Sequence, residues 1–155
     1  MRMSELYQAG QRTEIGSYTF TQDNIIRFAT RFDPQRFHVD PEAAKTTLFG
    51  GLCASGWHTC AAWMKTFVAF WESECARMAA EGLVAPKLGP SPGFEKLQWI
   101  RPVFVDETVT YSVTYLSGRA LASRPGWFLN TIFSEGINQD GVPVIRFESS
   151  VLEFE

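Results

Sequence analysis

Asp33 and His38 are the residues whose types and spacing best suit acid–base chemistry in this sequence. They lie in the segment FDPQRFH, where a proline and aromatic neighbours interrupt regular structure. An ionised carboxylate and an imidazole that titrates near neutral pH can divide the base and acid roles on one water molecule. On spacing alone, a histidine in a turn is more often a structural hydrogen-bond partner, so catalysis by this pair is a hypothesis.

A second candidate feature is the start of a long apolar helix, expected over about residues 56–81 with Ser55 as its cap. The first N–H groups of a helix have no partner inside it, and Gly56 lets another group approach closely. A carbonyl oxygen that gains negative charge would be stabilised there. A tight entry turn explains the glycine equally well.

The elements that would position these residues begin with a strand expected over residues 13–21, where β-branched and aromatic residues are mixed. A helix follows, with Thr21 or Asp23 as its cap and apolar residues at helical spacing. This helix is expected to end near Asp33, because Pro34 disfavours helical dihedral angles in the residue before it.

Asp40 and Pro41 predict the start of a second short helix, so His38 is expected in a connector between two helices. In the long helix over 56–81, the first half is apolar nearly all round, which predicts that other elements surround it. One stripe of this helix comprises Trp57, Cys60, Ala61, Met64, Phe67, Val68, Trp71, Cys75 and Met78.

After a loop rich in proline and glycine over residues 85–93, the hydrophobic period changes to two. Four strands are expected, over 95–105 with a break near Pro102, 107–117, 127–137 and 142–154. An antiparallel sheet wrapped around the long helix would bury the apolar surface of both. The sequence therefore predicts an α+β fold in which residues 1–155 form one domain.

Composition narrows the classes of partner and compartment. The formal net charge of −3 in 155 residues argues against nucleic acid as the main partner. The sequence has no secretory signal and no apolar run long enough to cross a bilayer, so we expect a cytoplasmic protein without a membrane partner. Its three cysteines have no zinc-like spacing; we expect free thiols and no metal site.

Several segments, taken together, resemble one family. DPQRFH at 33–38, followed by VDPEAA at 39–44, resembles the hydratase-2 motif of the MaoC-like dehydratases and (R)-specific enoyl-CoA hydratases, in which four residues also separate Asp and His. The resemblance continues in FGG at 49–51, ASGWHT at 54–59 and RPVFVDET at 101–108. It covers most of the chain in the same order.

The resemblance implies a hot-dog fold, a homodimer or larger even assembly, and an acyl thioester bound in a tunnel near the subunit boundary. It implies that Asp33 and His38 activate water for reversible addition to a trans-2-enoyl-CoA, which gives an (R)-3-hydroxyacyl-CoA. Gly56 would supply an amide to the oxyanion, and coenzyme A would be needed only as part of the substrate. The substrate-binding set expected around the pair is Gln35, Ser55, Gly56 and Trp57.

The sequence departs from the family pattern in two places. Gln35 and Arg36 replace the usual Asn-Pro, so Gln35 would orient the pair or the water. Ser55 replaces the histidine that often precedes the motif glycine, and residues 61–64 are apolar where a helix serine is common. Bulky side chains favour a short or branched acyl group; they are Trp57, Trp63, Met64 and Phe67.

Two other functions are compatible with these residues. A hot-dog thioesterase needs a carboxylate and a polarising helix end but no imidazole, and a non-catalytic module would bind acyl thioesters without turnover. His58 is more simply a buried structural residue than a pocket residue, and it does not pair with Cys60, because residues two apart on a helix point to different sides. Sequence does not choose which cations meet the coenzyme A phosphates among Arg36, Lys45, Lys87, Arg101, Arg119 and Arg124.

Overall fold

The structure, a computed structural model, describes residues 1–154. The helices are α1 (Met3–Leu6), α2 (Gln22–Phe32), α3 (Arg36–Val39), α4 (Pro41–Ala44) and α5 (Gly56–Ala80). The strands are β1 (Arg12–Thr19), β2 (Lys87–Leu88), β3 (Gly93–Trp99), β4 (Thr108–Ala120), β5 (Trp127–Ile137) and β6 (Pro143–Phe154). The expected long helix and the strand-rich second half are confirmed.

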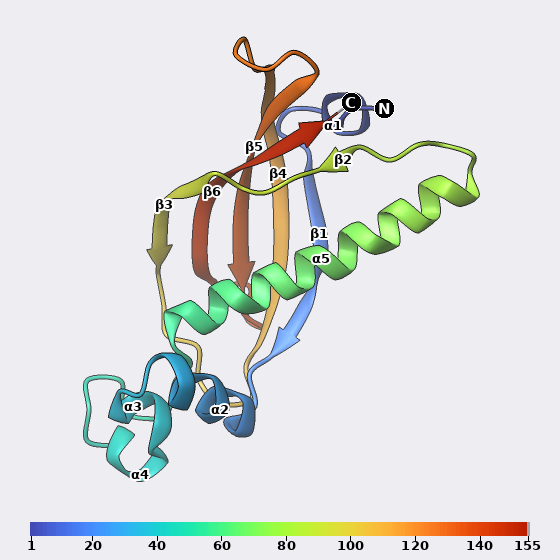
Figure 1. Cartoon of the computed structure of the whole chain (residues 1–155). Helices are drawn as coiled ribbons and strands as arrows, with labels where there is room; N and C mark the ends of the chain where they lie inside the picture. The colour runs from blue at the N-terminus through green and yellow to red at the C-terminus, as the bar shows by residue number, and fades with distance from the viewer. Residues whose placement is uncertain (155) are drawn as a thin grey trace.

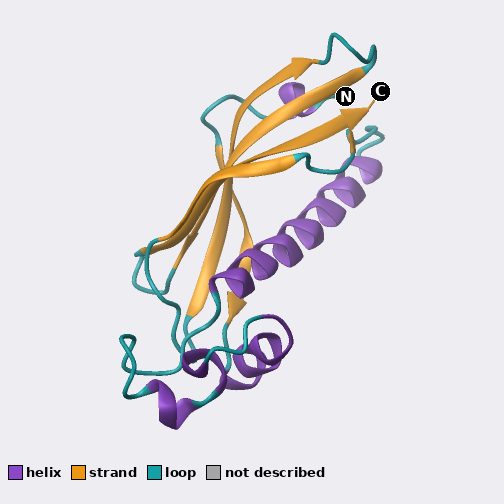
Figure 2. Cartoon of the chain, turned by 60° about the vertical axis from the view of Figure 1, so that its left-hand side comes forward, coloured by secondary structure: helices purple, strands orange, loops and turns teal. Residues whose placement is uncertain are grey.

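The strands form one antiparallel sheet. Its order is β1-β4-β5-β6-β2, and β3 also pairs with β6. Because β2 pairs with the end of β6 and β3 with its middle, the two short strands follow one another along the same edge. The sheet curls around one side of α5, which runs diagonally across its concave face (Figures 1 and 2).

Specific contacts fix α5 against the sheet. The Tyr111 hydroxyl donates a hydrogen bond of 2.8 Å to the backbone carbonyl of Thr59, and burial raises the Tyr111 pKa. Gly16, at a bulge in β1, has φ +128° and lies so close to α5 that an added Cβ would be 3.0 Å from the Thr66 methyl group. This helix wrapped by a curled sheet is the predicted hot-dog fold.

The prediction that other elements surround the first half of α5 is wrong. The buried residues of that half are His58, Thr59, Ala62, Trp63 and Thr66, whereas Trp57, Met64 and Val68 are exposed. The sheet covers only one side of the helix, so the predicted stripe faces partly outward. Among the helices of the described chain, none has the length and hydropathy needed to span a membrane.

The smaller elements near the site both confirm and correct the sequence analysis. Thr21 caps α2, and Asp40 caps α4, as predicted. His38, however, lies within the one-turn helix α3 rather than in a connector. Strand β3 ends at Trp99, before the break expected near Pro102, because it pairs with β6 only up to that residue.

Candidate active site

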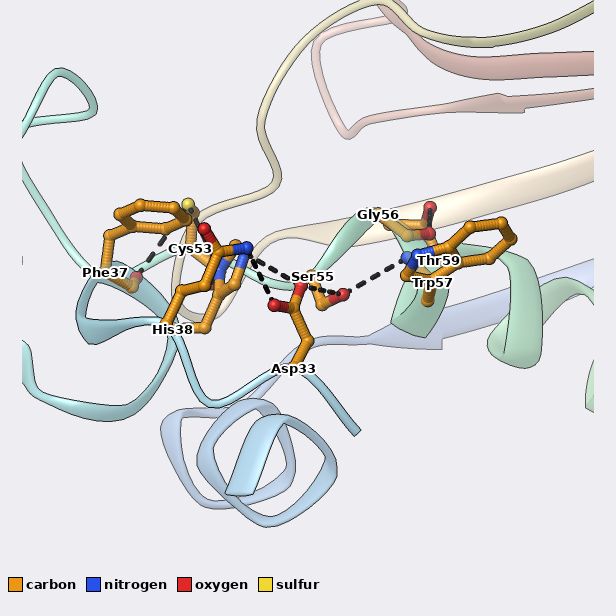
Figure 3. Close-up of polar contacts among 9 residues, drawn as sticks. Asp33, Phe37, His38, Cys53, Ser55, Gly56, Trp57 and Thr59 are labelled. Atoms are coloured by element: carbon orange, nitrogen blue, oxygen red, sulfur yellow. Dashed lines mark hydrogen bonds and ion pairs between the residues drawn. The ribbon is translucent and has the colours of Figure 1, made fainter. Parts of the chain in front are cut away.

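Three segments bring the predicted acid–base pair together (Figure 3). Asp33 follows the last residue of α2, and its backbone N–H bonds to the carbonyl of Ala29. His38 comes from α3, and Ser55 precedes α5. The Asp33 Oδ2 and His38 Nε2 atoms are 3.3 Å apart. The structure therefore confirms that residues 33 and 38 form one cluster.

A backbone carbonyl fixes the orientation of His38. The distance from His38 Nδ1 to the Cys53 carbonyl oxygen is 2.6 Å, and Cys53 is held in turn by its N–H bond to the Phe37 carbonyl. Because a carbonyl oxygen can only accept, Nδ1 carries the hydrogen, and Nε2 is the atom directed at Asp33. The imidazole thus presents one nitrogen to the carboxylate and keeps the other engaged.

The Asp33 carboxylate accepts hydrogen bonds on both oxygens. Gln35 Nε2 donates to Oδ1 and Ser55 Oγ donates to Oδ2, each at 2.7 Å. Burial alone raises the Asp33 pKa, but the hydrogen bonds from Gln35 and Ser55, together with the charge of His38, lower it below its ordinary value. Asp33 is therefore an ionised carboxylate at neutral pH and can accept a proton.

The spacing between Asp33 and His38 suits a shared small ligand. The His38 side chain is 7% exposed and that of Asp33 16% exposed, so both polar tips lie in a largely enclosed environment. Two atoms 3.3 Å apart can both lie within about 2.8 Å of a single water oxygen. The geometry allows the division of acid and base roles that the sequence suggests.

The start of α5 lies next to this pair. Ser55 Oγ, besides donating to Asp33, accepts a hydrogen bond of 3.2 Å from the Trp57 N–H and so caps the helix. The N–H of His58 bonds to the Ser55 carbonyl. Within residues 1–154, the N–H of Gly56 has no hydrogen-bond acceptor, so it is the amide left to meet a ligand oxygen.

The three predicted substrate-binding side chains besides Gly56 have different surroundings. Gln35 and Ser55 contact Asp33 directly, whereas the Trp57 side chain contacts the indole of Trp99, with ring centroids 5.0 Å apart. The Ser55 hydroxyl is already engaged, which favours a positioning role over direct substrate contact. Two neighbours of these residues are not predicted from the sequence, the Cys53 carbonyl and Trp99, because a backbone acceptor leaves no compositional signal and Trp99 is typical of an ordinary strand.

The second histidine lies outside this polar cluster. His58 is stacked on Phe28, with ring centroids 4.6 Å apart, and the edges of its ring face Tyr18 and Phe20. Burial lowers the His58 pKa to about 4. This environment agrees with the structural role favoured from the sequence. In the described residues, no three side chains of His, Cys, Asp or Glu gather as metal ligands would.

Comparison with known proteins gives consistent results. The family model of the MaoC like domain matches residues 7–124. The uncharacterized protein YdeM of Bacillus subtilis (strain 168) is 30% identical over 152 residues, which cover 98% of each chain. The crystal structure of the MaoC-like dehydratase from Rhodospirillum rubrum is 32% identical, with a TM-score of 0.79 over 97% of this chain and 95% of that one.

A more distant structure shares the fold. The (R)-hydratase from A. caviae, described as involved in PHA biosynthesis, is 20% identical and has a TM-score of 0.62, covering 96% of this chain and 97% of its own. The family match spans most of the sequence and includes both Asp33 and His38. The chain therefore belongs to the MaoC-like domain family.

Proposed function

We propose that this protein is a hydro-lyase that reversibly adds water to a trans-2-enoyl-CoA to give an (R)-3-hydroxyacyl-CoA. Membership of the MaoC-like family supports a function of the hydratase or dehydratase type. The observation that carries the finer proposal is the 3.3 Å contact between Asp33 Oδ2 and His38 Nε2, close to the Gly56 N–H, which has no acceptor among residues 1–154. Base, acid and oxyanion donor would then lie around one substrate.

The chemical roles follow from the hydrogen bonds of each group. Asp33 takes a proton from the bound water while the water oxygen bonds to C3 of the enoyl group. The π electrons move toward the thioester oxygen, which accepts a hydrogen bond from the Gly56 N–H. His38, protonated on Nε2, delivers that proton to C2. A proton then passes from Asp33 to His38 across their contact, which restores both groups.

A direct assay separates this proposal from a thioesterase and from a binding module. Purified protein is mixed with crotonyl-CoA, and enoyl absorbance and free thiol are followed in parallel. A hydratase removes the enoyl absorbance without releasing thiol, and Asp33→Asn abolishes this change. Thiol release that persists in His38→Ala would instead favour the thioesterase, in which the carboxylate and helix start act alone. Binding without either signal would favour the non-catalytic module.

We also propose that the active form is a homodimer or a larger even assembly. Exposed apolar side chains of α5 and β3 line one shared hollow, namely Trp57, Met64, Val68 and Phe94, and the exposed Trp99 contacts Trp57. Contiguous apolar surface of this kind is typical of subunit contacts. Light scattering on the protein as it elutes from a size-exclusion column should give an even multiple of the chain mass of 17.5 kDa. A monomer at micromolar concentration would contradict the proposal.

A further inference from the structure

The imidazole of His38 is held at one nitrogen by a short hydrogen bond. Its Nδ1 atom donates to the Cys53 carbonyl at 2.6 Å, whereas Nε2 lies 3.3 Å from Asp33 Oδ2. A single hydrogen bond fixes the position of one ring atom but leaves the ring free to tilt about that atom. For Nε2 to stay directed at Asp33, packing against the ring must restrict this tilt.

Phe37 supplies that packing. Its ring meets the His38 imidazole edge to face, with centroids 4.5 Å apart and an angle of 80° between the two planes. The Phe37 carbonyl accepts a hydrogen bond of 3.1 Å from the Cys53 N–H, so its backbone is attached to the residue that also holds Nδ1 (Figure 3). A phenyl ring makes no such bond, so its position depends on the side chains that pack against it.

Phe49 packs on the Phe37 ring from a nearby turn. The two rings are in edge contact, with centroids 5.0 Å apart. The turn closes through a hydrogen bond of 3.0 Å from the Gly50 N–H to the Thr47 carbonyl. Its two central side chains have different surroundings, since Leu48 is 96% exposed and Phe49 is half-buried. The turn therefore directs Leu48 to solvent and Phe49 toward Phe37.

A second contact joins the same segment to α3. Arg36 Nη2 donates a hydrogen bond of 3.2 Å to the Thr46 hydroxyl. Arg36, Phe37 and His38 are consecutive residues of α3, which has only four residues. One helical turn is not stable by itself, so its position depends on contacts with the rest of the protein. Residues 46–49 thus support α3 at two consecutive residues.

We propose that Phe49 is a positioning residue, which acts through the ring of Phe37 to keep His38 Nε2 directed at Asp33. This inference rests on the proposed function for the role of His38. Without the Phe49 ring, Phe37 can turn into the vacated space, and the imidazole loses its support. Misplacement of a catalytic group by about 1 Å can slow a reaction about a hundredfold. The thioester does not depend on Phe49 for binding.

Two measurements on Phe49→Ala test the inference. The first is the hydration of crotonyl-CoA, for which we expect kcat to fall about tenfold to a hundredfold and KM to stay within about threefold of wild type. The second is the exchange of the His38 Nδ1 proton with water, followed by proton–nitrogen NMR. Its signal is identified by its absence in His38→Ala. We expect this exchange to be roughly tenfold faster, because the ring leaves the Cys53 carbonyl more often.

The matched control removes a half-buried phenylalanine from the opposite end of the molecule. Phe154 ends β6 and meets the Trp127 ring edge to face, with centroids 4.3 Å apart (Figure 1). Phe154→Ala should lower stability but leave kcat and the Nδ1 exchange rate unchanged. Phe49→Leu is a milder variant, which should shift both values in the same direction as Phe49→Ala. Phe49→Tyr keeps the ring and should match wild type. Far-UV circular dichroism verifies the folding of each protein.

Three results would overturn the inference in a protein that hydrates crotonyl-CoA. Two are a folded Phe49→Ala variant with an unchanged kcat and one with an unchanged Nδ1 exchange rate. The third is an equal acceleration of exchange in Phe154→Ala, which would show general loosening of the fold. Failure of the hydratase proposal is recognised separately, as a protein that does not hydrate crotonyl-CoA but whose Nδ1 exchange still responds to Phe49→Ala.

Discussion

The two histidines of this protein are equally hidden from solvent, yet their surroundings differ completely. His38 is 6% exposed and His58 is 4% exposed. His38 has a carbonyl at one nitrogen and a carboxylate at the other. His58 lies among three aromatic rings; its Nε2 is 3.3 Å from the Tyr18 hydroxyl, and its Nδ1 has no hydrogen-bond partner within residues 1–154.

This difference shows that burial alone does not create an acid–base group. Burial without a charged partner disfavours the cationic form of an imidazole, and the lowered pKa of His58 reflects this. His38 differs in its geometry, because its Nε2 atom lies 3.3 Å from the Asp33 carboxylate. Asp33 thus gives the His38 ring a carboxylate partner, which the aromatic surroundings of His58 do not provide.

The sharpest contrast should come from removing each imidazole in turn. His38→Ala is expected to reduce kcat for crotonyl-CoA roughly a hundredfold to ten-thousandfold, the range typical of a lost general acid. His58→Leu, which replaces the ring with an apolar side chain of similar volume, should keep kcat within about threefold of wild type. Steady-state hydration rates at pH 7 measure the two variants. Equal losses of activity would contradict the different roles assigned to the two histidines.

The stability of the protein in acid should depend on His58, whose removal is expected to leave activity nearly unchanged. His58 has a pKa of about 4 in the folded protein against 6.5 for an ordinary histidine, so the unfolded chain binds the proton more readily. The free energy of unfolding should therefore fall as the pH drops from 6.5 toward 4, by about 3 kcal/mol in total. His58→Leu removes this contribution. Urea midpoints at pH 7 and pH 4 should then show a smaller acid loss than in wild type; an unchanged loss would contradict the assignment.

Ser55→Ala tests whether the polar surroundings of Asp33 hold its pKa down. Loss of one of its hydrogen bonds should raise the Asp33 pKa, so the acid limb of kcat/KM moves to higher pH. The stability that ionised Asp33 contributes is present above its unfolded pKa and is lost as pH falls through the folded value. The variant would then lose that stability at a higher pH than wild type.

The matched control for Ser55→Ala is Thr21→Ala, since Thr21 caps α2 in the same way. Each substitution should cost about 1 kcal/mol of stability through the lost cap. Only Ser55→Ala should move the acid limb. A shift of equal size in both variants would show that the change reflects general destabilisation.

The smallest effect is expected at Tyr18, whose hydroxyl makes the one polar contact of the His58 ring within residues 1–154. Tyr18→Phe leaves the ring packing intact and removes a long hydrogen bond, so it should cost about 1 kcal/mol or less. Activity should not change. Thermal unfolding measures the stability of the variant and the crotonyl-CoA assay its activity. A large loss of activity would link the aromatic surroundings of His58 to catalysis.

Much of this arrangement could be predicted from the sequence because local signals carry it. Pro34 ends α2 and places Asp33 just beyond it, and the caps Thr21 and Asp40 mark the starts of two helices. The four-residue separation of Asp33 and His38 brings the pair together through one turn of α3. Short-range geometry of this kind is encoded in residues that are neighbours in the chain.

Long-range features could not be predicted in the same way. The apolar stripe of α5 does not reveal which side the sheet covers, because both sides of its first half are apolar. The contact of Trp99 with Gly56 joins positions 43 residues apart, and nothing local to either residue indicates it. The hydrogen bond between Ser55 and Asp33 likewise joins residues 22 positions apart, at the end of α2 and the start of α5.

The central claim is that Asp33 and His38 act as one unit on one water molecule. A double-mutant cycle on kcat/KM for crotonyl-CoA, with Asp33→Asn, His38→Ala and the protein carrying both changes, tests it most directly. Joint action predicts that the double variant is no more than about threefold slower than the slower single variant. Losses that multiply would show that the two side chains act independently and would contradict the account.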